Sequence, residues 1–242
     1  MGNYVDLFPP YIIHYDGSIN SSTGKLINLK DSGTYDGTFG NYNANQIVTN
    51  KFGIKKGLQF NNGVNNQSAN TPAFLDGVSE ITLFYLFRID TITTSRLFAW
   101  NNGTPAGYVV WWDATSPNVG VQYWVRNGSN GSITGIQVDS IALHGSWATL
   151  AVTYKNGTTA YSKLYINGNL IGSQAHSAAG TLGTIGTINT IGDATNNYYP
   201  KITFGTMIAF SSELSTDNIR KLHELFMRRI INDPYDLRIY HK

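Results

Sequence analysis

The chain has 242 residues, a formal net charge of +2 and no cysteine. Charged residues make up only 13% of it, while glycine, asparagine and threonine are abundant. This composition is typical of many strands joined by tight turns, and the length suits one β-sandwich with a sizeable core. The lack of cysteine excludes disulfides and thiolate metal sites. The small net charge disfavours nucleic acid as a partner, because phosphate contacts need a basic stripe.

Neither the start of the sequence nor any later stretch has the pattern of a secretion or membrane signal. Residues 1–17 lack the basic start and the long apolar run of a signal peptide. No segment approaches the roughly 20 apolar residues that a membrane span requires. We therefore expect a soluble protein without a signal peptide and without membrane insertion.

Short apolar runs separated by turn residues begin near the N-terminus. Tyr11–Tyr15 follows two prolines, which predicts an opening strand at a sheet edge. Residues 17–57 carry many turn formers around two strand candidates, 26–29 and 37–40. Residues 81–89 are apolar on both sides, which predicts a central strand buried on both faces.

Four further strand candidates follow, separated by turn residues at regular spacing: Arg96–Trp100, Tyr108–Asp113, Val119–Arg126 and Ile133–Val138. Short strands at such spacing predict a β-sandwich. The segment 177–197 is rich in glycine, alanine and threonine, which predicts loops around one strand at Ile188–Ile191.

The most regular pattern begins at Trp147. Residues 147–154 alternate with period 2, which predicts a central strand. Residues 161–166 and 169–173 flank Asn167-Gly168, the dipeptide most typical of a two-residue type I′ turn. Such a turn would place apolar pairs on both faces of the hairpin. The expected pairs are Ile166 with Asn169, Tyr165 with Leu170, and Leu164 with Ile171.

A C-terminal helix is predicted to start after Ser215, which is a favourable N-cap residue. Asp217 lies in the first turn, where the helix dipole favours negative charge, and Pro234 enforces the end. An apolar stripe at helical spacing consists of Ile219, Leu222, Leu225, Phe226, Ile230 and Ile231. We therefore expect a single domain made of a sandwich over 1–215, a packed helix over 216–231 and a tail over 232–242.

Three stretches, in this order, resemble laminin G-like, concanavalin A-like jelly-roll domains. They are Gly53–Phe60, the pattern W-x-x-x-A-V-T-Y followed by L-Y-I-N-G-x-L-I-G-S from Trp147 onward, and Ile208–Leu222, where a closing strand precedes a helix. The resemblance spans roughly residues 10–225. It implies an all-β fold, a two-sheet antiparallel jelly-roll β-sandwich of the concanavalin A-like type with one C-terminal α-helix.

Glycoside hydrolases of the same superfamily carry two carboxylates in an E-x-D-x-x-E pattern on one strand. This sequence has only Glu80, Glu213 and Glu224, and none stands in that pattern. Each is interpreted as ordinary surface charge, and no Asp pair at strand spacing replaces them. No nucleophile elbow, zinc motif or phosphate-binding loop occurs either. We therefore predict that the protein is not an enzyme and has no catalytic residue.

Aromatic residues gather in the middle of the chain and are candidates for ligand contact, because flat rings stack on sugar faces at low entropic cost. Trp124 is in period with Gln122 and Arg126, which predicts a solvated side of that strand. Trp111 and Trp112 are consecutive, so one belongs to the core and the other is exposed, and the sequence leaves open which. The candidate ligand-binding residues are Trp124, Arg126, Trp111 and Trp112, with core packing as the alternative for each.

The resemblance also implies calcium, because many jelly-roll domains of this kind bind it through loop carboxylates and carbonyls. Asp193, with Asn196 and Asn197, offers oxygen ligands. A turn needs the same residue types. Asp193 is therefore the metal candidate, and no other cofactor is expected.

The primary hypothesis is a non-enzymatic structural or adhesion module of a bacteriophage virion, such as a head decoration, fibre or tail component. It rests on the missing secretion signal, the composition and residues 232–237, which resemble the ends of phage-encoded domains of this family. The partners would be other virion proteins, its own oligomer or a cell-surface glycan. A free carbohydrate-binding module, which needs an accessible aromatic platform, and a glycan hydrolase, which needs two facing carboxylates, are the alternatives.

Overall fold

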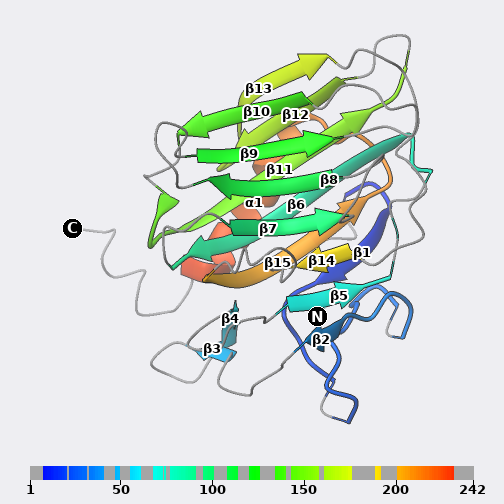
Figure 1. The fold of residues 1–242 in the computed structure, drawn as a ribbon, viewed down its shortest axis with the longest axis vertical. Coiled ribbons are helices and arrows are strands. Elements are labelled where there is room, and N and C mark those ends of the chain that lie inside the picture. The colour runs from blue at the N-terminus through cyan, green and yellow to red at the C-terminus, as the bar shows by residue number, and fades with distance from the viewer. Residues whose placement is uncertain are drawn as a thin grey trace.

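The computed structural model describes residues 8–20, 22–31, 33–40, 47–49, 55–60, 68–72, 74, 77–90, 95–100, 108–113, 120–125, 134–139, 143–157, 161–175, 189–191 and 201–231. Within these residues, fifteen strands form two antiparallel sheets, and a C-terminal helix lies against one of them (Figure 1). The predicted two-sheet antiparallel sandwich with a C-terminal helix is confirmed.

The first sheet contains eight of the described strands. In pairing order they are β13 (Asn169–Ala175), β12 (Tyr161–Ile166), β11 (Trp147–Lys155), β6 (Glu80–Ile89), β15 (Ile202–Phe210), β4 (Lys55–Phe60) and β3 (Ile47–Thr49), and β1 (Tyr11–Tyr15) also pairs with β15. Strands β6 and β11 lie inside this sheet, as their apolar patterns predicted.

The second sheet contains seven of the described strands. In pairing order they are β10 (Thr134–Asp139), β9 (Gly120–Val125), β8 (Tyr108–Asp113), β7 (Ser95–Trp100), β14 (Asn189–Ile191), β5 (Ser68–Thr71) and β2 (Thr38–Gly40). The strand expected over 26–29 does not form, because Leu26 makes only isolated bridges, to Ile19 and Gly37.

Alternation along β6 divides its side chains between two cores. Leu83 and Tyr85 lie in the core between the two sheets, together with Ala69 and Ile191 of the second sheet. Phe84, from the other face of the strand, packs under the helix. The apolar pattern on both sides of β6 therefore reflects a strand that is covered twice.

Helix α1 (Thr216–Ile231) covers the outer face of the first sheet (Figure 1). Ser215 caps it as predicted, because its Oγ accepts a hydrogen bond from the Asn218 N–H at 3.2 Å. Its buried apolar residues are Ile219, Leu222, Phe226 and Ile230. Helix, first sheet and second sheet thus form three layers. Among the described helical residues, no stretch has the length and apolar character needed to cross a membrane.

The turn between β12 and β13 is of the predicted type. Asn167 and Gly168 both have positive φ angles, 50° and 77°, as a type I′ turn requires. A Cβ on Gly168 would lie only 3.2 Å from His223 Cβ and 3.3 Å from Arg220 Cα of helix α1. Glycine is therefore needed here both for the backbone angle and for the close approach of the turn to the helix.

Strand β13 contains a β-bulge that the sequence did not predict. The two pairs nearest the turn form as expected, but Leu164 then pairs with Gly172. The predicted pair of Leu164 with Ile171 is therefore wrong. The extra residue falls at Ile171, whose side chain is 42% exposed.

Candidate functional site

The register of the second sheet decides which positions belong to its outer face. Ala69 pairs with Ile191, and both are buried in the core between the sheets. Ile191 pairs with Phe98, Phe98 with Val110, and Val110 with Tyr123. These positions therefore belong to the inner face, and the positions that alternate with them belong to the outer face.

In β8, β9 and β10 this division agrees with the chemistry of the residues. The inner positions are Tyr108, Val110, Trp112, Val121, Tyr123, Val125, Thr134, Ile136 and Val138. The outer positions are Val109, Trp111, Asp113, Gly120, Gln122, Trp124, Gly135, Gln137 and Asp139. The inner set is apolar or aromatic except for Thr134, whereas four of the nine outer positions are polar, a pattern that suits one buried and one solvated face. We call the nine outer positions the outer face of β8–β10.

Trp111 and Trp124 belong to the outer face of β8–β10, and Trp112 belongs to the inner face. Trp111 pairs with Gln122, and Trp124 pairs with Val109. The two outer tryptophans are thus diagonal neighbours on adjacent strands, with Cα atoms about 7–8 Å apart. Register therefore distinguishes the two consecutive tryptophans that the sequence left undecided. Ligand contact by these residues stays a prediction.

Two other predicted site residues, Arg126 and Asp193, lie outside the described residues, so their roles also stay predictions. Arg96 was not singled out from the sequence, although it pairs with Trp111 from the neighbouring strand β7. Among the residues that the structure describes, no three His, Cys, Asp or Glu side chains gather in a way that could hold a metal ion.

Asp113 and Asp139 occupy one row of the outer face of β8–β10. Each of them pairs with Gly120, from opposite sides of β9. Two strand spacings separate their Cα atoms, which is about 9–10 Å. This pair lies on two different strands, so it differs from a pair at the spacing of one strand, which the sequence does not contain. The pair is invisible in the sequence because two hairpins, rather than one strand, bring the residues together.

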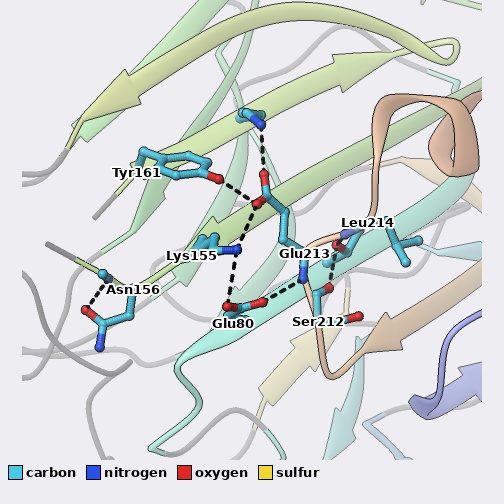
Figure 2. Close-up of polar contacts among 10 residues, drawn as sticks. Glu80, Lys155, Asn156, Tyr161, Ser212, Glu213 and Leu214 are labelled. Carbon is cyan, nitrogen blue, oxygen red and sulfur yellow. Dashed lines mark hydrogen bonds and ion pairs between the residues drawn. The ribbon is translucent and has the colours of Figure 1, made fainter. Parts of the chain in front are cut away.

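A polar network lies on the outer face of the first sheet, where the chain leaves β15 and enters helix α1 (Figure 2). Glu213 Oε1 accepts a hydrogen bond from Lys163 Nζ at 2.8 Å, and Oε2 accepts one from the Tyr161 hydroxyl at 2.6 Å. Lys155 Nζ lies 3.5 Å from Glu80 and 3.9 Å from Glu213. Only 11% of the Glu213 side chain is exposed, so its interpretation as ordinary surface charge is wrong.

This network fits a structural role better than a catalytic one. Burial, helped by the hydrogen bond to Glu213, raises the pKa of Tyr161 to about 12, so the phenol keeps its proton and donates it. Both oxygens of Glu213 are engaged, and Lys155 lies beside both carboxylates. A glycosidase needs two carboxyl groups that are free to act on a sugar from two sides. The contacts instead tie the start of the helix to β6, β11 and β12.

Glu213→Gln should lower the free energy of unfolding by about 2 kcal/mol, because it leaves the partly buried Lys163 without its charged partner. The matched control is Glu224→Gln, which affects an exposed pair with Arg228 at 3.8 Å and should cost less than about 0.5 kcal/mol. Urea unfolding of both variants measures the difference. Equal losses of unfolding free energy for the two variants would contradict the structural role proposed for the contacts of Glu213.

A histidine joins the helix to the hairpin side of the first sheet. His223 Nδ1 lies 2.8 Å from the Thr149 hydroxyl, which makes a hydrogen bond between α1 and β11. Burial lowers the pKa of His223 below its ordinary value of 6.5, and the Glu224 charge opposes that shift. As the pH falls below about 6.5, the unfolded chain therefore binds a proton at this residue before the folded chain does.

We expect the stability that neutral His223 contributes to be complete above pH 6.5 and to be lost as the pH falls toward its folded-state pKa. The difference in unfolding free energy between the protein and His223→Asn should therefore be largest near pH 7.5 and smaller at pH 5. Urea unfolding of both proteins at the two pH values measures this difference in unfolding free energy. Because both proteins contain the other histidines, the contributions of those residues cancel in the difference. A difference that grows on acidification would refute this assignment.

A second network lies on the same sheet face near the start of β11. Asp90 accepts hydrogen bonds from Arg88 Nε at 2.5 Å, Gln59 Nε2 at 2.8 Å and Thr203 Oγ1 at 2.7 Å. The Arg88 guanidinium also lies 5.7 Å from the ring centroid of Trp147, a cation–π contact. These hydrogen bonds and the cation–π contact join β4, β6, β11 and β15, so this network also stabilises the sheet.

The fold and this distribution of residues define a lectin-like β-sandwich, with a polar and aromatic sheet face on the side away from the helix. The chain belongs to the concanavalin A-like lectin/glucanases superfamily, whose laminin G family model matches residues 61–220. No curated protein matches the sequence closely enough to count as a relative.

Solved structures with the same fold include receptor-binding parts of clostridial toxins. The binding domain of Paraclostridial mosquitocidal protein 1 is 15% identical, with a TM-score of 0.66 over 89% of this chain and 52% of that one. The botulinum neurotoxin serotype D binding domain is 15% identical, with a TM-score of 0.64 over 88% of this chain and 50% of that one. The serotype D ligand-binding domain in complex with N-acetylneuraminic acid is 13% identical, with a TM-score of 0.64 and coverages of 88% and 50%. This chain therefore spans about half of each, and the similarity concerns the fold.

Proposed function

We propose that the protein is a non-enzymatic carbohydrate-binding module whose ligand lies on the outer face of β8–β10. The observation that carries this proposal is the register that makes Trp111 and Trp124 diagonal neighbours on that face. Indole rings at such a spacing suit stacking against sugar rings, and residues of the types of Gln122 and Gln137 provide hydrogen bonds to hydroxyls.

Two findings about other proteins support carbohydrate as the ligand class. The superfamily is described as one of lectins and glucanases. One structure with this fold contains N-acetylneuraminic acid, bound to a neurotoxin ligand-binding domain. Glycan adhesion is thus a function for which this architecture is used.

A glycan hydrolase is the second candidate, and the row of Asp113, Gly120 and Asp139 favours it. Inverting glycosidases place two carboxyl groups about 6.5–9.5 Å apart, a range that two strand spacings approach. The adhesion function is preferred because a catalytic acid needs an apolar site that raises its pKa, and the outer positions next to this pair include Gln122 and Gln137. Release of reducing sugar that Asp113→Asn abolishes would establish the hydrolase instead.

The setting that we propose for this module is the outside of a larger assembly such as a virion. This part rests on the sequence alone, since the tail over 232–242 lies outside the described residues. Its test is co-purification of the protein with intact particles. Absence from such particles would leave a free carbohydrate-binding module.

The test of carbohydrate binding is a glycan array followed by calorimetry with the strongest ligand. Trp111→Ala and Trp124→Ala should each weaken binding by about 30-fold or more, as aromatic hot spots do when truncated. Leu170→Ala is the matched control, because Leu170 is an apolar residue of the first sheet that is 47% exposed. This variant should bind like the unmodified protein. If no glycan binds, or if all three variants bind equally, the proposal is wrong.

A further inference from the structure

Two Asn-Gly pairs lie in the described part of the chain, and the fold holds their asparagines differently. They are Asn156-Gly157, directly after β11, and Asn167-Gly168, in the turn between β12 and β13. Four further Asn-Gly pairs of the sequence lie outside the described residues. In such a pair the backbone nitrogen of the glycine can attack the side-chain amide of the asparagine with little hindrance, because glycine has no Cβ beside that nitrogen.

At Asn156 the side-chain amide lies next to the backbone nitrogen of the following residue. The Gly157 N–H donates a hydrogen bond to Asn156 Oδ1 at 3.0 Å, which is the dashed line at Asn156 in Figure 2. Because a C=O bond is about 1.2 Å long, Asn156 Cγ lies no more than about 4.2 Å from this nitrogen. A small rotation of the side chain is enough to reach the separation of about 3–3.5 Å from which bond formation proceeds. Asn156 is partly exposed and Gly157 is exposed, so water reaches both.

At Asn167 the same side-chain atom binds a different strand. Asn167 Oδ1 accepts a hydrogen bond from the Thr149 N–H at 3.0 Å, and the Asn167 N–H donates one to the Thr149 carbonyl oxygen at 2.9 Å. Gly168 is buried, in close contact with His223 of helix α1. An attack of the Gly168 nitrogen on Asn167 Cγ therefore requires loss of the bond to Thr149 and local opening of the turn.

We infer that Asn156 is a site of spontaneous deamidation, and that the fold directs this reaction to Asn156 rather than to Asn167. The Gly157 nitrogen gives up its proton through water and forms a bond to Asn156 Cγ. The bond between Cγ and Nδ2 breaks, Nδ2 takes up a proton and leaves as ammonia, and a five-membered succinimide ring remains. Water then adds to one of the two ring carbonyls and opens the ring to aspartate or isoaspartate. The reaction consumes one water molecule and needs no oxidant, reductant or cofactor.

The product changes the charge beside the polar network of Figure 2. Asn156 follows Lys155, and its N–H donates a hydrogen bond at 2.8 Å to the carbonyl oxygen of Ser79, the residue before Glu80. Lys155 Nζ already lies 3.5 Å from Glu80 and 3.9 Å from Glu213. Each conversion therefore brings a third carboxylate to this end of the network, and that carboxylate is ionised at neutral pH.

The experiment is incubation of the full chain at slightly alkaline pH, once in native buffer and once in guanidinium chloride. Peptide mapping by mass spectrometry follows each site, since deamidation adds about 1 Da, and an isoaspartate O-methyltransferase identifies the isoaspartyl product. In the folded protein, Asn156 should convert at least about tenfold faster than Asn167. In guanidinium chloride the two rates should come within about threefold of each other, because the unfolded chain lacks the contacts that distinguish the two sites.

Two variants test the chemistry at Asn156, and their unfolding temperatures show whether the fold is kept. Asn156→Gln should abolish conversion at this position, because the longer side chain would have to form a six-membered ring. Gly157→Val should slow it at least about tenfold, because a β-branched side chain hinders the attacking nitrogen. Neither change should alter the rate at Asn167. Equal rates at the two sites in the folded protein, faster conversion of Asn167, or a ratio of rates that guanidinium chloride leaves unchanged would each overturn the inference.

Discussion

Gly57→Ala should lower the free energy of unfolding by about 3 kcal/mol, at the upper end of the range for overpacked sites. A Cβ at this position would lie 2.4 Å from the carbonyl oxygen of Phe204 and 3.1 Å from its carbonyl carbon. Both are backbone atoms of β15, which pairs with β4 on one side and with β6 on the other. The collision can therefore be relieved only by moving a strand that two neighbours hold.

The matched control for this substitution is Gly145→Ala. Gly145 has a φ of +75°, and a Cβ there would meet nothing within 4 Å. Its replacement should cost about 1–2 kcal/mol through left-handed backbone strain alone. Urea unfolding of both variants measures the two losses. A loss for Gly57→Ala that is no larger than that of Gly145→Ala would show that β4 and β15 do not approach so closely.

Trp147→Ala should lower the free energy of unfolding by about 3 kcal/mol, the low end of the range for large core residues, because the side chain is only partly buried. Its ring lies over Gly205, where a Cβ would come within 2.9 Å of Trp147 Cζ3. The ring therefore reaches from β11 across β6 to β15. Its removal would leave a cavity over two strands and would also remove the cation–π contact with Arg88.

Thermal and urea unfolding provide the measurement, and Trp147→Phe is the companion variant. Phenylalanine keeps an aromatic ring and most of the apolar contact, so it should retain more than half of the lost stability. A cost below about 1 kcal/mol for Trp147→Ala would be inconsistent with a tryptophan that bridges these strands.

Local patterns were sufficient to predict most of the strands and the helix. The dipeptide Asn167-Gly168 was enough to predict the type I′ turn, because the backbone preferences of these two residues do not depend on distant residues. Ser215 and Asp217 likewise marked the helix start. The bulge at Ile171 was missed because an apolar residue in a regular strand carries no local sign of an extra residue.

The candidate site was only partly visible in the sequence, because its geometry depends on which strands pair. Alternation within β9 was enough to predict that Trp124 shares one side of the strand with Gln122. Choosing between Trp111 and Trp112 required the register that links β8 through β7 to the buried Ile191 of β14, two strands along the pairing order. Asp113 and Asp139 lie in one row, and Glu213 contacts Lys163. In both cases the residues are far apart in the sequence, and no spacing pattern indicates that they are neighbours.

The bulge in β13 affects the tendency of copies of this protein to aggregate with one another. β13 is the last strand in the described order of the first sheet, and it carries two exposed apolar residues, Leu170 and Ile171. A straight terminal strand of this kind would be a template on which another chain could add by backbone pairing, the first step of aggregation. The extra residue at Ile171 bends the strand and interrupts the regular spacing of its N–H and C=O groups. The irregularity therefore protects the molecule against growth of the sheet from one copy to the next.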